Sequence, residues 1–213
     1  MDYSVSHKLA EKIKTVTEFH QSSLKEKGSE FIAFVFPVEN EESALQELKI
    51  LRKKYFDATH HCFAFKIIGC ETKYSDDGEP KGTAGIRILN AIEHFGLTNI
   101  LVVVVRYFGG TKLGVGPLGK AYYNSALKVL NESKIIELNL YQLVEIITEF
   151  EHLNHLHRTL NNFAAIIAAS DFSDKAKFDC LIKPSLINQV ISDLVNLTNG
   201  KAEIRAINKF NYR

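Results

Sequence analysis

The sequence lacks an excess of charge of either sign. Its 213 residues include 26 Lys and Arg residues against 25 Asp and Glu residues, which gives a formal net charge of +1. This balance argues against a protein that coats nucleic acid over its whole surface, because such binding neutralises many phosphates with basic side chains. Any contact with nucleic acid therefore requires a local basic patch.

Long apolar runs are also missing. The run Ile100–Val105 is far shorter than the roughly 20 residues that a membrane helix requires. The start of the chain includes Asp2, His7 and Lys8 and no apolar core, so no secretory signal is visible. These absences predict a cytoplasmic protein that does not associate with a membrane.

Cysteine is scarce, and its spacing matches no known cluster. Cys62, Cys70 and Cys180 form no C-x-x-C pair and no zinc-like pattern, which is typical of reduced thiols in a cytosolic protein. Cys62 is a candidate catalytic thiol, but a buried core cysteine is the favoured interpretation because free cysteines commonly pack in cores. We expect no metal site and no cofactor.

Glycine is concentrated in the first part of the chain. All of the 12 glycines except Gly200 lie at or before Gly119, and the sequence after them is regular and apolar. This change predicts an α+β protein with two domains, at residues 1–136 and 137–213. The order of elements expected in the second domain is βαββαβ, which is typical of a ferredoxin-like plait. For that domain, a binding or regulatory role is favoured over catalysis.

Hydrophobic periodicity and capping residues predict the individual elements. Asn40 is expected to cap the first helix and Gly96 to end the second. In the first domain we expect a weak strand region at 3–19, strands at 31–38, 61–68 and 100–105, and helices at 40–55, 86–95 and 118–131. In the second domain we expect strands at 142–150, 164–170, 175–182 and 201–207, and helices at 153–162 and 184–198.

A first glycine-rich loop spans Asp76–Gly85. Its acids Asp76, Asp77 and Glu79 are oxygen donors of the kind that bind a divalent cation, but their spacing differs from that of a calcium-binding loop. A turn whose Asp side chains bond local N–H groups is the favoured alternative. Farther along the loop, Thr83 lies at the expected start of a helix, where free N–H groups can receive an anion.

A second glycine-rich loop spans Gly109–Gly119, after a central strand and before a helix. It matches parts of two nucleotide-binding patterns, but the gap between Val105 and Gly114 is too long for a dinucleotide fingerprint, and Ala121 replaces the hydroxyl of a P-loop. What remains is a set of backbone N–H groups with basic side chains, which favours phosphate or carboxylate. Tyr107 and Phe108 are candidates for stacking on a base, although a core position is favoured for Phe108.

Histidines offer weaker candidates. His60 and His61 are adjacent on an expected strand, where neighbouring side chains point to opposite faces, so one metal ion cannot easily bind both. His152 and His155 share a helix face without an accompanying carboxylate motif, and a solvated helix face is favoured there.

Three stretches carry a resemblance to a known family. DATHHC at 57–62, SDDGEPKGTAG at 75–85 and VVVRYFGGTKLGVG at 103–116 are similar in order and spacing to the signature of the IMPACT family, in particular of its bacterial YigZ-type members. The resemblance covers roughly residues 27–131. Pro117 and Lys120 depart from the glycine and arginine usual in the family. Pro117 removes an N–H from the second loop, and lysine lacks the bidentate fork of arginine.

The resemblance implies both a fold and a setting. The first domain would resemble the second domain of small-subunit ribosomal protein five, and the second would resemble the ferredoxin-like last domain of elongation factor G. Eukaryotic members of the family are translation regulators that bind the activator of a stress-responsive initiation-factor kinase. A contact with RNA or the ribosome is the usual inference for the bacterial members, and it rests partly on fold.

Three functions remain open at this point. The favoured one is a translation-linked regulator or accessory factor that binds RNA or the ribosome. The alternatives are an enzyme acting on a phosphate- or carboxylate-bearing small molecule and a protein-interaction adaptor. The candidate ligand-binding residues are His60, Asp76, Asp77, Glu79, Thr83, Arg106, Tyr107, Gly109, Gly110, Lys112, Gly114, Gly116 and Lys120.

Overall fold

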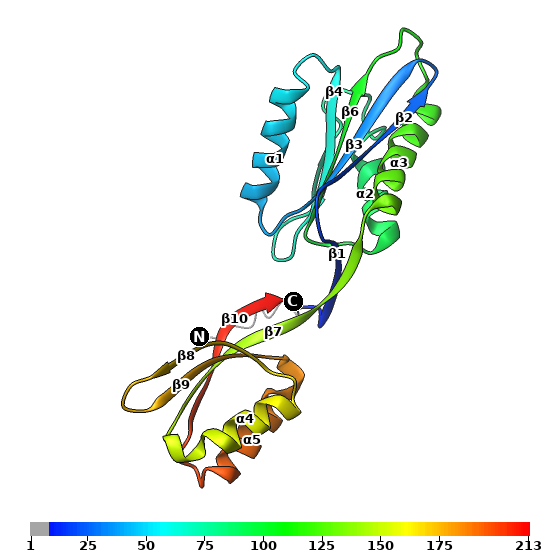
Figure 1. The fold of residues 1–213 in the computed structure, drawn as a ribbon. Helices are drawn as coiled ribbons and strands as arrows, with labels where there is room; N and C mark the ends of the chain where they lie inside the picture. The colour runs from blue at the N-terminus through cyan, green and yellow to red at the C-terminus, as the bar shows by residue number, and fades with distance from the viewer. Residues whose placement is uncertain (1–8) are drawn as a thin grey trace, which may run out of the picture. The chain divides into compact units, whose positions relative to one another are not determined.

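The computed structural model describes residues 9–213. The start of the weak strand region expected at 3–19 therefore lies outside the described residues. The described chain forms two compact units, one containing Ile13–Glu137 and the other containing Ala10–Lys12 and Leu138–Arg213. Each unit combines a β-sheet with helices (Figure 1). The predicted α+β class with two domains is confirmed. No helix within residues 9–213 is long and apolar enough to cross a membrane.

The first unit is built on an antiparallel sheet of five strands. Their order across the sheet is β2 (His20–Glu26), β3 (Ser29–Pro37), β6 (Ile100–Tyr107), β4 (His60–Lys66) and β5 (Lys73–Ser75). Strand β6 is central and is buried from Ile100 to Arg106. The prediction of a central strand is confirmed, because an apolar run without alternation suits a strand covered on both faces.

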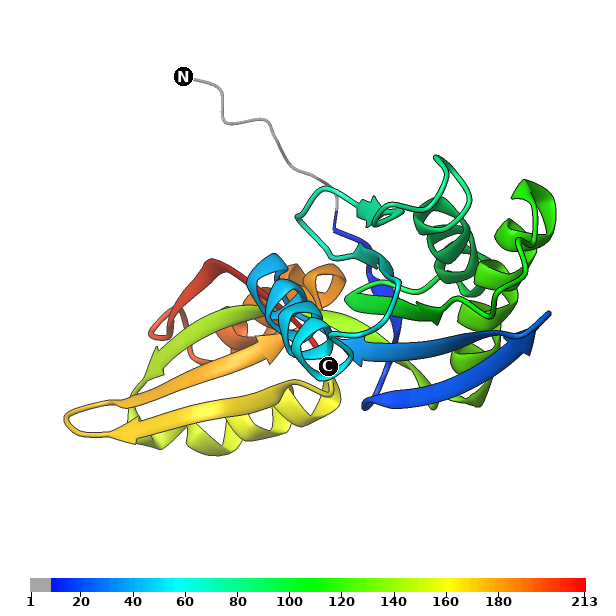
Figure 2. The same cartoon turned by 90° about the horizontal axis from the view of Figure 1, so that it is seen from above.

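Helices cover both faces of this sheet. Helix α1 (Glu41–Lys54) packs on one face, against a cluster that includes Leu101 and Val103. Helices α2 (Gly85–Phe95) and α3 (Val115–Glu132) lie side by side on the other face, against a cluster that includes Val102 and Val104 (Figure 1, Figure 2). Alternate side chains of β6 thus pack into two separate cores, one on each face of the sheet.

Capping residues set the helix limits largely as predicted. The Asn40 side chain accepts a hydrogen bond from the Ser43 N–H and caps α1, while Gly96 ends α2 in the left-handed conformation, with φ of 64°. Helix α3 begins three residues before the predicted Leu118, because Gly114, at φ of 83°, already turns the chain into the helix.

Strand β2 was not predicted. Its sequence HQSSLKE is mostly polar, and half of its positions face outward at the edge of the sheet. A tight turn at Lys27 and Gly28, both with positive φ, joins it to β3, and the two strands pair from His20–Val35 to Glu26–Ser29. Cross-strand pairing therefore makes this segment a strand without an apolar pattern of its own.

The second unit has the predicted plait. Strand β7 (Ile135–Thr148) leads through a short turn of 3₁₀ helix, η1 (Phe150–His152), into α4 (Leu153–Asn162), β8 (Ile166–Phe172) and β9 (Ala176–Ile182). A second such turn, η2 (Pro184–Leu186), then leads into α5 (Ile187–Leu197) and β10 (Glu203–Tyr212). The antiparallel order β10-β7-β9-β8 is that of a ferredoxin-like sheet, and β1 (Lys12–Val16) also pairs with β7.

Both helices of the plait pack on a core of their own, formed around Val144, Phe178 and Leu194. Helix α4 has the predicted limits. Strand β7 starts at Ile135, before the predicted residue 142, and it pairs with β1 as well as with β9 and β10. Strand β10 extends beyond the predicted residue 207 by pairing with β7 up to Tyr212.

Candidate functional site

The first loop is bonded internally through Asp76. Its carboxylate accepts hydrogen bonds from the N–H groups of Gly82, Ala84 and Gly85 at 2.8, 2.9 and 2.8 Å. Burial raises the pKa of Asp76, but these three hydrogen bonds outweigh it, so the pKa lies below its ordinary value. The start of α2 thus holds a carboxylate of the chain itself, and the expectation that it receives an outside anion is corrected.

Asp77 and Thr83 are also committed to internal bonds. The Asp77 carboxylate accepts from the His61 N–H at 2.6 Å and from Arg52 Nη2 at 2.8 Å. The hydroxyl of Thr83, which is buried, donates to the Pro80 carbonyl at 2.6 Å. Asp77 therefore pairs with Arg52 and not with Arg106. An enzyme site shared by the two loops would need Asp77 close to Arg106, and the structure does not bring these two side chains together.

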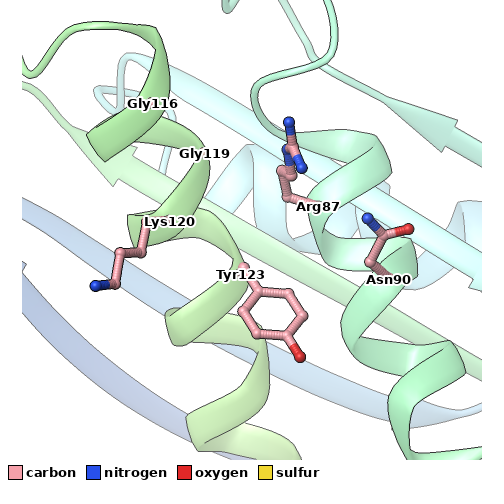
Figure 3. Close-up of a pocket in the computed structure, with 6 residues that line it drawn as sticks. All are labelled: Arg87, Asn90, Gly116, Gly119, Lys120 and Tyr123. Atoms are coloured by element: carbon pink, nitrogen blue, oxygen red, sulfur yellow. The ribbon is translucent and has the colours of Figure 1, made fainter.

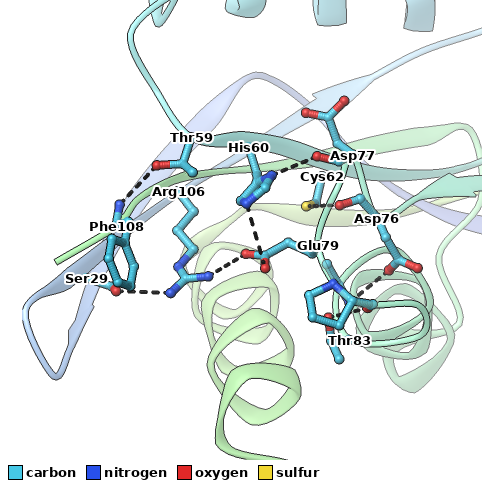
Figure 4. Close-up of polar contacts among 12 residues, drawn as sticks. Ser29, Thr59, His60, Cys62, Asp76, Asp77, Glu79, Thr83, Arg106 and Phe108 are labelled. Carbon is cyan, nitrogen blue, oxygen red and sulfur yellow. Dashed lines mark hydrogen bonds and ion pairs between the residues drawn. The ribbon is translucent and has the colours of Figure 1, made fainter. Parts of the chain in front are cut away.

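Glu79 is the acid that joins the two loops. Its Oε1 accepts from Arg106 Nη1 at 2.6 Å (Figure 4). The same oxygen accepts from the Tyr122 hydroxyl at 2.8 Å. Glu79 and Arg106 are only 8% and 6% exposed. A charge pair that is this deeply buried is held in place because either charge alone in the interior is costly.

Arg106 contacts several neighbouring side chains besides Glu79. Its Nη2 donates to the Ser29 hydroxyl at 3.2 Å, and its guanidinium lies 5.3 Å from the Phe31 ring centroid and 5.6 Å from that of Phe108. Its Nε has no hydrogen-bond partner among the described residues. The guanidinium thus lies within cation–π distance of two aromatic rings, which favours a cation.

His60 approaches the same pair from β4. Its Nδ1 lies 2.7 Å from the Asp77 carbonyl oxygen and its Nε2 lies 3.8 Å from Glu79 Oε2 (Figure 4). A carbonyl oxygen only accepts, so Nδ1 is the donor of this hydrogen bond. His60 thereby supports the first loop and borders the Glu79–Arg106 pair.

Cys62 lies beneath the loop as a neutral thiol. Its Sγ donates to the Asp76 carbonyl at 3.0 Å, and the side chain is fully buried. Burial raises the pKa of the Cys62 thiol far above its ordinary value. Cys62 belongs to the core cluster on this face of the sheet, so its favoured interpretation as a buried core cysteine is confirmed.

A hollow of about 340 Å³ opens beside Arg106 and the start of α3. Phe108 stands at its rim and is 48% exposed, so the prediction of a core position for this ring is wrong. Lys112 is exposed and lies in the same wall. We call this the Phe108 hollow, and it is lined by Glu79, Pro80, Arg106, Phe108, Lys112, Leu113, Gly114, Val115 and Leu118.

The first turn of α3 faces this hollow without a cap. No side chain within the described residues caps the helix, and its first turn contains no acid. The first N–H groups of a helix lack intrahelical partners, and Gly114 and Val115, which line the hollow, lie at this end. Backbone donors and Lys112 together favour an anion in this hollow, while the charge of Arg106 is already paired with Glu79.

The remaining glycines of the second loop have different roles. A Cβ at Gly109 would lie 1.9 Å from the Gly28 carbonyl carbon, so Gly109 permits close packing against the β2–β3 turn. Gly110, Gly114 and Gly116 have no described atom within 4 Å of an added Cβ, and the first two have positive φ. Close packing thus requires a glycine at position 109, while the backbone at Gly110, Gly114 and Gly116 is open to solvent.

Tyr107 points away from the hollow. Its hydroxyl donates to Asp57 Oδ1 at 2.7 Å, and this bond raises its pKa to about 12. The ring packs against the core beneath α1, on the face opposite to that of Arg106, because adjacent strand residues alternate. The structure therefore separates Tyr107 from the other aromatic and basic candidates.

Lys120 and Gly116 line a second hollow, of about 380 Å³, between α2 and α3 (Figure 3). Arg87 lines this hollow too, and the sequence motifs did not predict Tyr122, Ser29 and Phe31 as neighbours of the Glu79–Arg106 pair. A buried tyrosine on a helix and a serine after a turn carry no sequence signal, because only the fold brings them to Arg106.

Comparison with known proteins places this site in a family. The Impact N-terminal domain matches residues 27–130, and a domain of unknown function, DUF1949, matches residues 146–201. The IMPACT family member YvyE of Bacillus subtilis (strain 168) is 30% identical over 90% of this chain and 89% of its own length. The IMPACT family member YigZ of Escherichia coli (strain K12) is 31% identical over 85% of this chain and 91% of its own length.

A solved structure extends the likeness to three dimensions. A crystal structure described as that of a hypothetical protein superposes with a TM-score of 0.69 at 26% identity and covers 94% of this chain and 100% of its own. The match to the Impact N-terminal domain includes both Glu79 and Arg106, and the two relatives match this chain over most of its length. The chain therefore belongs to the IMPACT family.

Proposed function

We propose that this protein is a translation-linked regulator or accessory factor that binds structured RNA or the ribosome through the Phe108 hollow. The observation that carries the proposal is the half-exposed Phe108 ring, which lies within cation–π distance of the buried Arg106 guanidinium and lines the same hollow as Lys112. An exposed aromatic ring next to donors for an anion is the combination that binds a base and its phosphate together. The link to translation rests on the family resemblance.

The chemistry of the hollow suits a nucleotide unit of RNA. Base stacking on an aromatic side chain contributes roughly 1–3 kcal/mol, and Lys112 with the uncapped start of α3 supplies positive potential for the phosphate. Because the net charge of the chain is only +1, binding depends on this local patch and not on a general basic surface.

The contacts of the acids favour binding over catalysis. Asp76 and Asp77 are used by local donors, and Glu79 Oε1 accepts from both Arg106 and Tyr122. A general base must reach a substrate proton within hydrogen-bond distance, and Glu79 is only 8% exposed, which restricts the access of a substrate to its carboxylate. An enzyme and a protein adaptor are therefore the alternatives that the experiment must separate.

The test measures binding of the full chain to fluorescent RNA hairpins and to ribosomes over a series of salt concentrations. We expect Phe108→Ala to weaken binding about 5- to 150-fold, the equivalent of the stacking energy. Lys112→Gln should lower the slope of log K against log salt by about 0.7–0.9, the value for one phosphate contact. Phe56→Ala and Lys53→Gln are matched controls, since Phe56 is 82% exposed and both lie at α1 or just after it.

Two results would contradict the proposal. One is a weak, salt-independent signal that Phe108→Ala leaves unchanged. The other is capture of a defined protein partner after nuclease treatment, with Phe108→Ala abolishing it, which would favour the adaptor. Arg106→Ala is not a useful variant here, because it leaves the Glu79 carboxylate buried without its partner.

A further inference from the structure

The hollow between α2 and α3 has the features of a second binding site. It measures about 380 Å³ and is lined by Arg87, Asn90, Gly116, Gly119, Lys120 and Tyr123 (Figure 3). None of these six residues lines the Phe108 hollow. We call it the α2–α3 groove. Its lining contains two cationic side chains and no acid.

Arg87 is held in place across the groove. Its Nε donates to the Gly82 carbonyl at 3.3 Å, and a Cβ at Gly119 would lie 3.2 Å from that same nitrogen. The side chain therefore rests on the glycine, and a larger residue at 119 would push it away. Its two terminal nitrogens make no hydrogen bond or ion pair with any described residue, so they are free to bind a ligand.

Lys120 adds a second charge without a counter-charge. It is exposed, and no acidic side chain among residues 9–213 pairs with it. Lys120 differs in this from Lys66, whose ammonium forms an ion pair with Glu93. Arg87 and Lys120 thus add positive charge to the lining of the groove with no acid in that lining, which favours an anion.

The other groups at the groove are mainly hydrogen-bond donors. The Asn90 amide and the Tyr123 hydroxyl face it from α2 and α3 (Figure 3), and both can donate to oxygen. Gly116 leaves the helix backbone uncovered, with no described atom within 4 Å of an added Cβ. A guanidinium, an ammonium and neutral donors around an open backbone match the several oxygens of a phosphate group.

We propose that the α2–α3 groove binds a phosphate group, with Arg87 and Lys120 as its charged ligands. The first turn of α3 lies between this groove and the Phe108 hollow, since Gly114 and Val115 line one and Gly116 lines the other. In bound RNA, the groove takes a second phosphate beside the nucleotide at Phe108. This last step rests on the function proposed above, whereas the phosphate site itself does not.

The first experiment uses inorganic phosphate and no RNA. Phosphate is titrated into the ¹⁵N-labelled full chain, and we expect saturable shifts of the Gly116 and Gly119 amide signals. The double variant Arg87→Gln with Lys120→Gln should lose them, while Lys49→Gln with Lys53→Gln, an equal charge change on exposed α1 positions, should keep them. Signals that do not move, or that move equally in both variants, overturn the phosphate site.

The second experiment separates the source of the phosphate. For an RNA hairpin, the groove variant should lower the slope of log K against log salt by about 0.7–0.9, the value for one phosphate contact, in addition to the effect of Lys112→Gln. If phosphate shifts the groove signals but RNA of any kind fails to bind, the site stands as one for a free phosphate compound and the RNA function fails. If RNA binds with an unchanged slope in the groove variant, the second RNA contact is overturned.

Discussion

At the scale of single residues, the two glycine-rich loops meet through one buried ion pair. Glu79 comes from the first loop and Arg106 from the end of β6, and both are almost completely removed from solvent. Tyr122, Ser29 and two aromatic rings complete the bonds of this pair. The acid and the base that the sequence suggested as opposing ligand-binding groups thus first serve each other.

Loss of one partner of this pair should be costly. We expect Arg106→Ala to lower the free energy of unfolding by about 3–5 kcal/mol, because it strands the Glu79 charge in the interior. The double variant Arg106→Met with Glu79→Gln should lose less unfolding free energy than the sum of the losses in the single variants Arg106→Met and Glu79→Gln, because the two side chains are coupled. Urea denaturation measures this. Arg52→Ala, at the exposed partner of Asp77, should cost under about 1 kcal/mol, and equal losses at the two arginines would contradict the assignment.

At the scale of elements, the start of α2 is fastened by a carboxylate from the preceding loop. Asp76 bonds three N–H groups at this helix end, which is the role of a capping side chain even though it is remote from the N-cap position. The start of α3 has no such side chain within the described residues. Two neighbouring helices thus differ in whether their positive end is already neutralised, and only the second is left open to a ligand.

Asp76→Asn should reveal this cap through pH. The folded pKa of Asp76 lies below its unfolded value, so its ionised form stabilises the fold fully above the unfolded pKa, near 4. That contribution is lost as pH falls through the folded pKa. We expect the variant to be less stable by about 1–2 kcal/mol at pH 7, with a difference that shrinks as the pH drops below about 4. Denaturation curves at several pH values test this, and a difference that grows toward acid pH would refute the cap.

At the scale of the whole molecule, each compact unit has its own core. The first unit has separate clusters on the two faces of its sheet, and the second has one cluster beneath α4 and α5. The candidate binding groups all lie in the first unit. Because each unit buries its own apolar residues, we expect each unit to unfold locally without unfolding of the other.

A cavity in the second core should therefore act locally. Leu194→Ala removes a fully buried side chain of α5, which typically costs about 2–5 kcal/mol. We expect faster amide hydrogen exchange in β9 and unchanged exchange in β6 of the first unit. Equal acceleration in both strands would show that the two units open together, and Val195→Ala, at an exposed position of the same helix, serves as the control.

The sequence by itself determined the elements with strong local signals. The apolar run of β6, the Asn40 cap and the Gly96 stop follow from side-chain chemistry within a few residues, so pattern and position predicted them. The order βαββαβ also indicated the plait before any contact was known. The polar strand β2 escaped prediction because its pairing with β3, and not its own pattern, makes it a strand.

The tertiary structure alone decided what the loop residues do. Asp76, Asp77 and Glu79 are alike in sequence, yet one caps a helix, one holds Arg52 and one is buried against Arg106. The bonds of a carboxylate depend on which donors the fold brings within about 3 Å, and those donors come from distant parts of the chain. The same reason moved Tyr107 away from the hollow and divided the basic candidates between the Phe108 hollow and the α2–α3 groove.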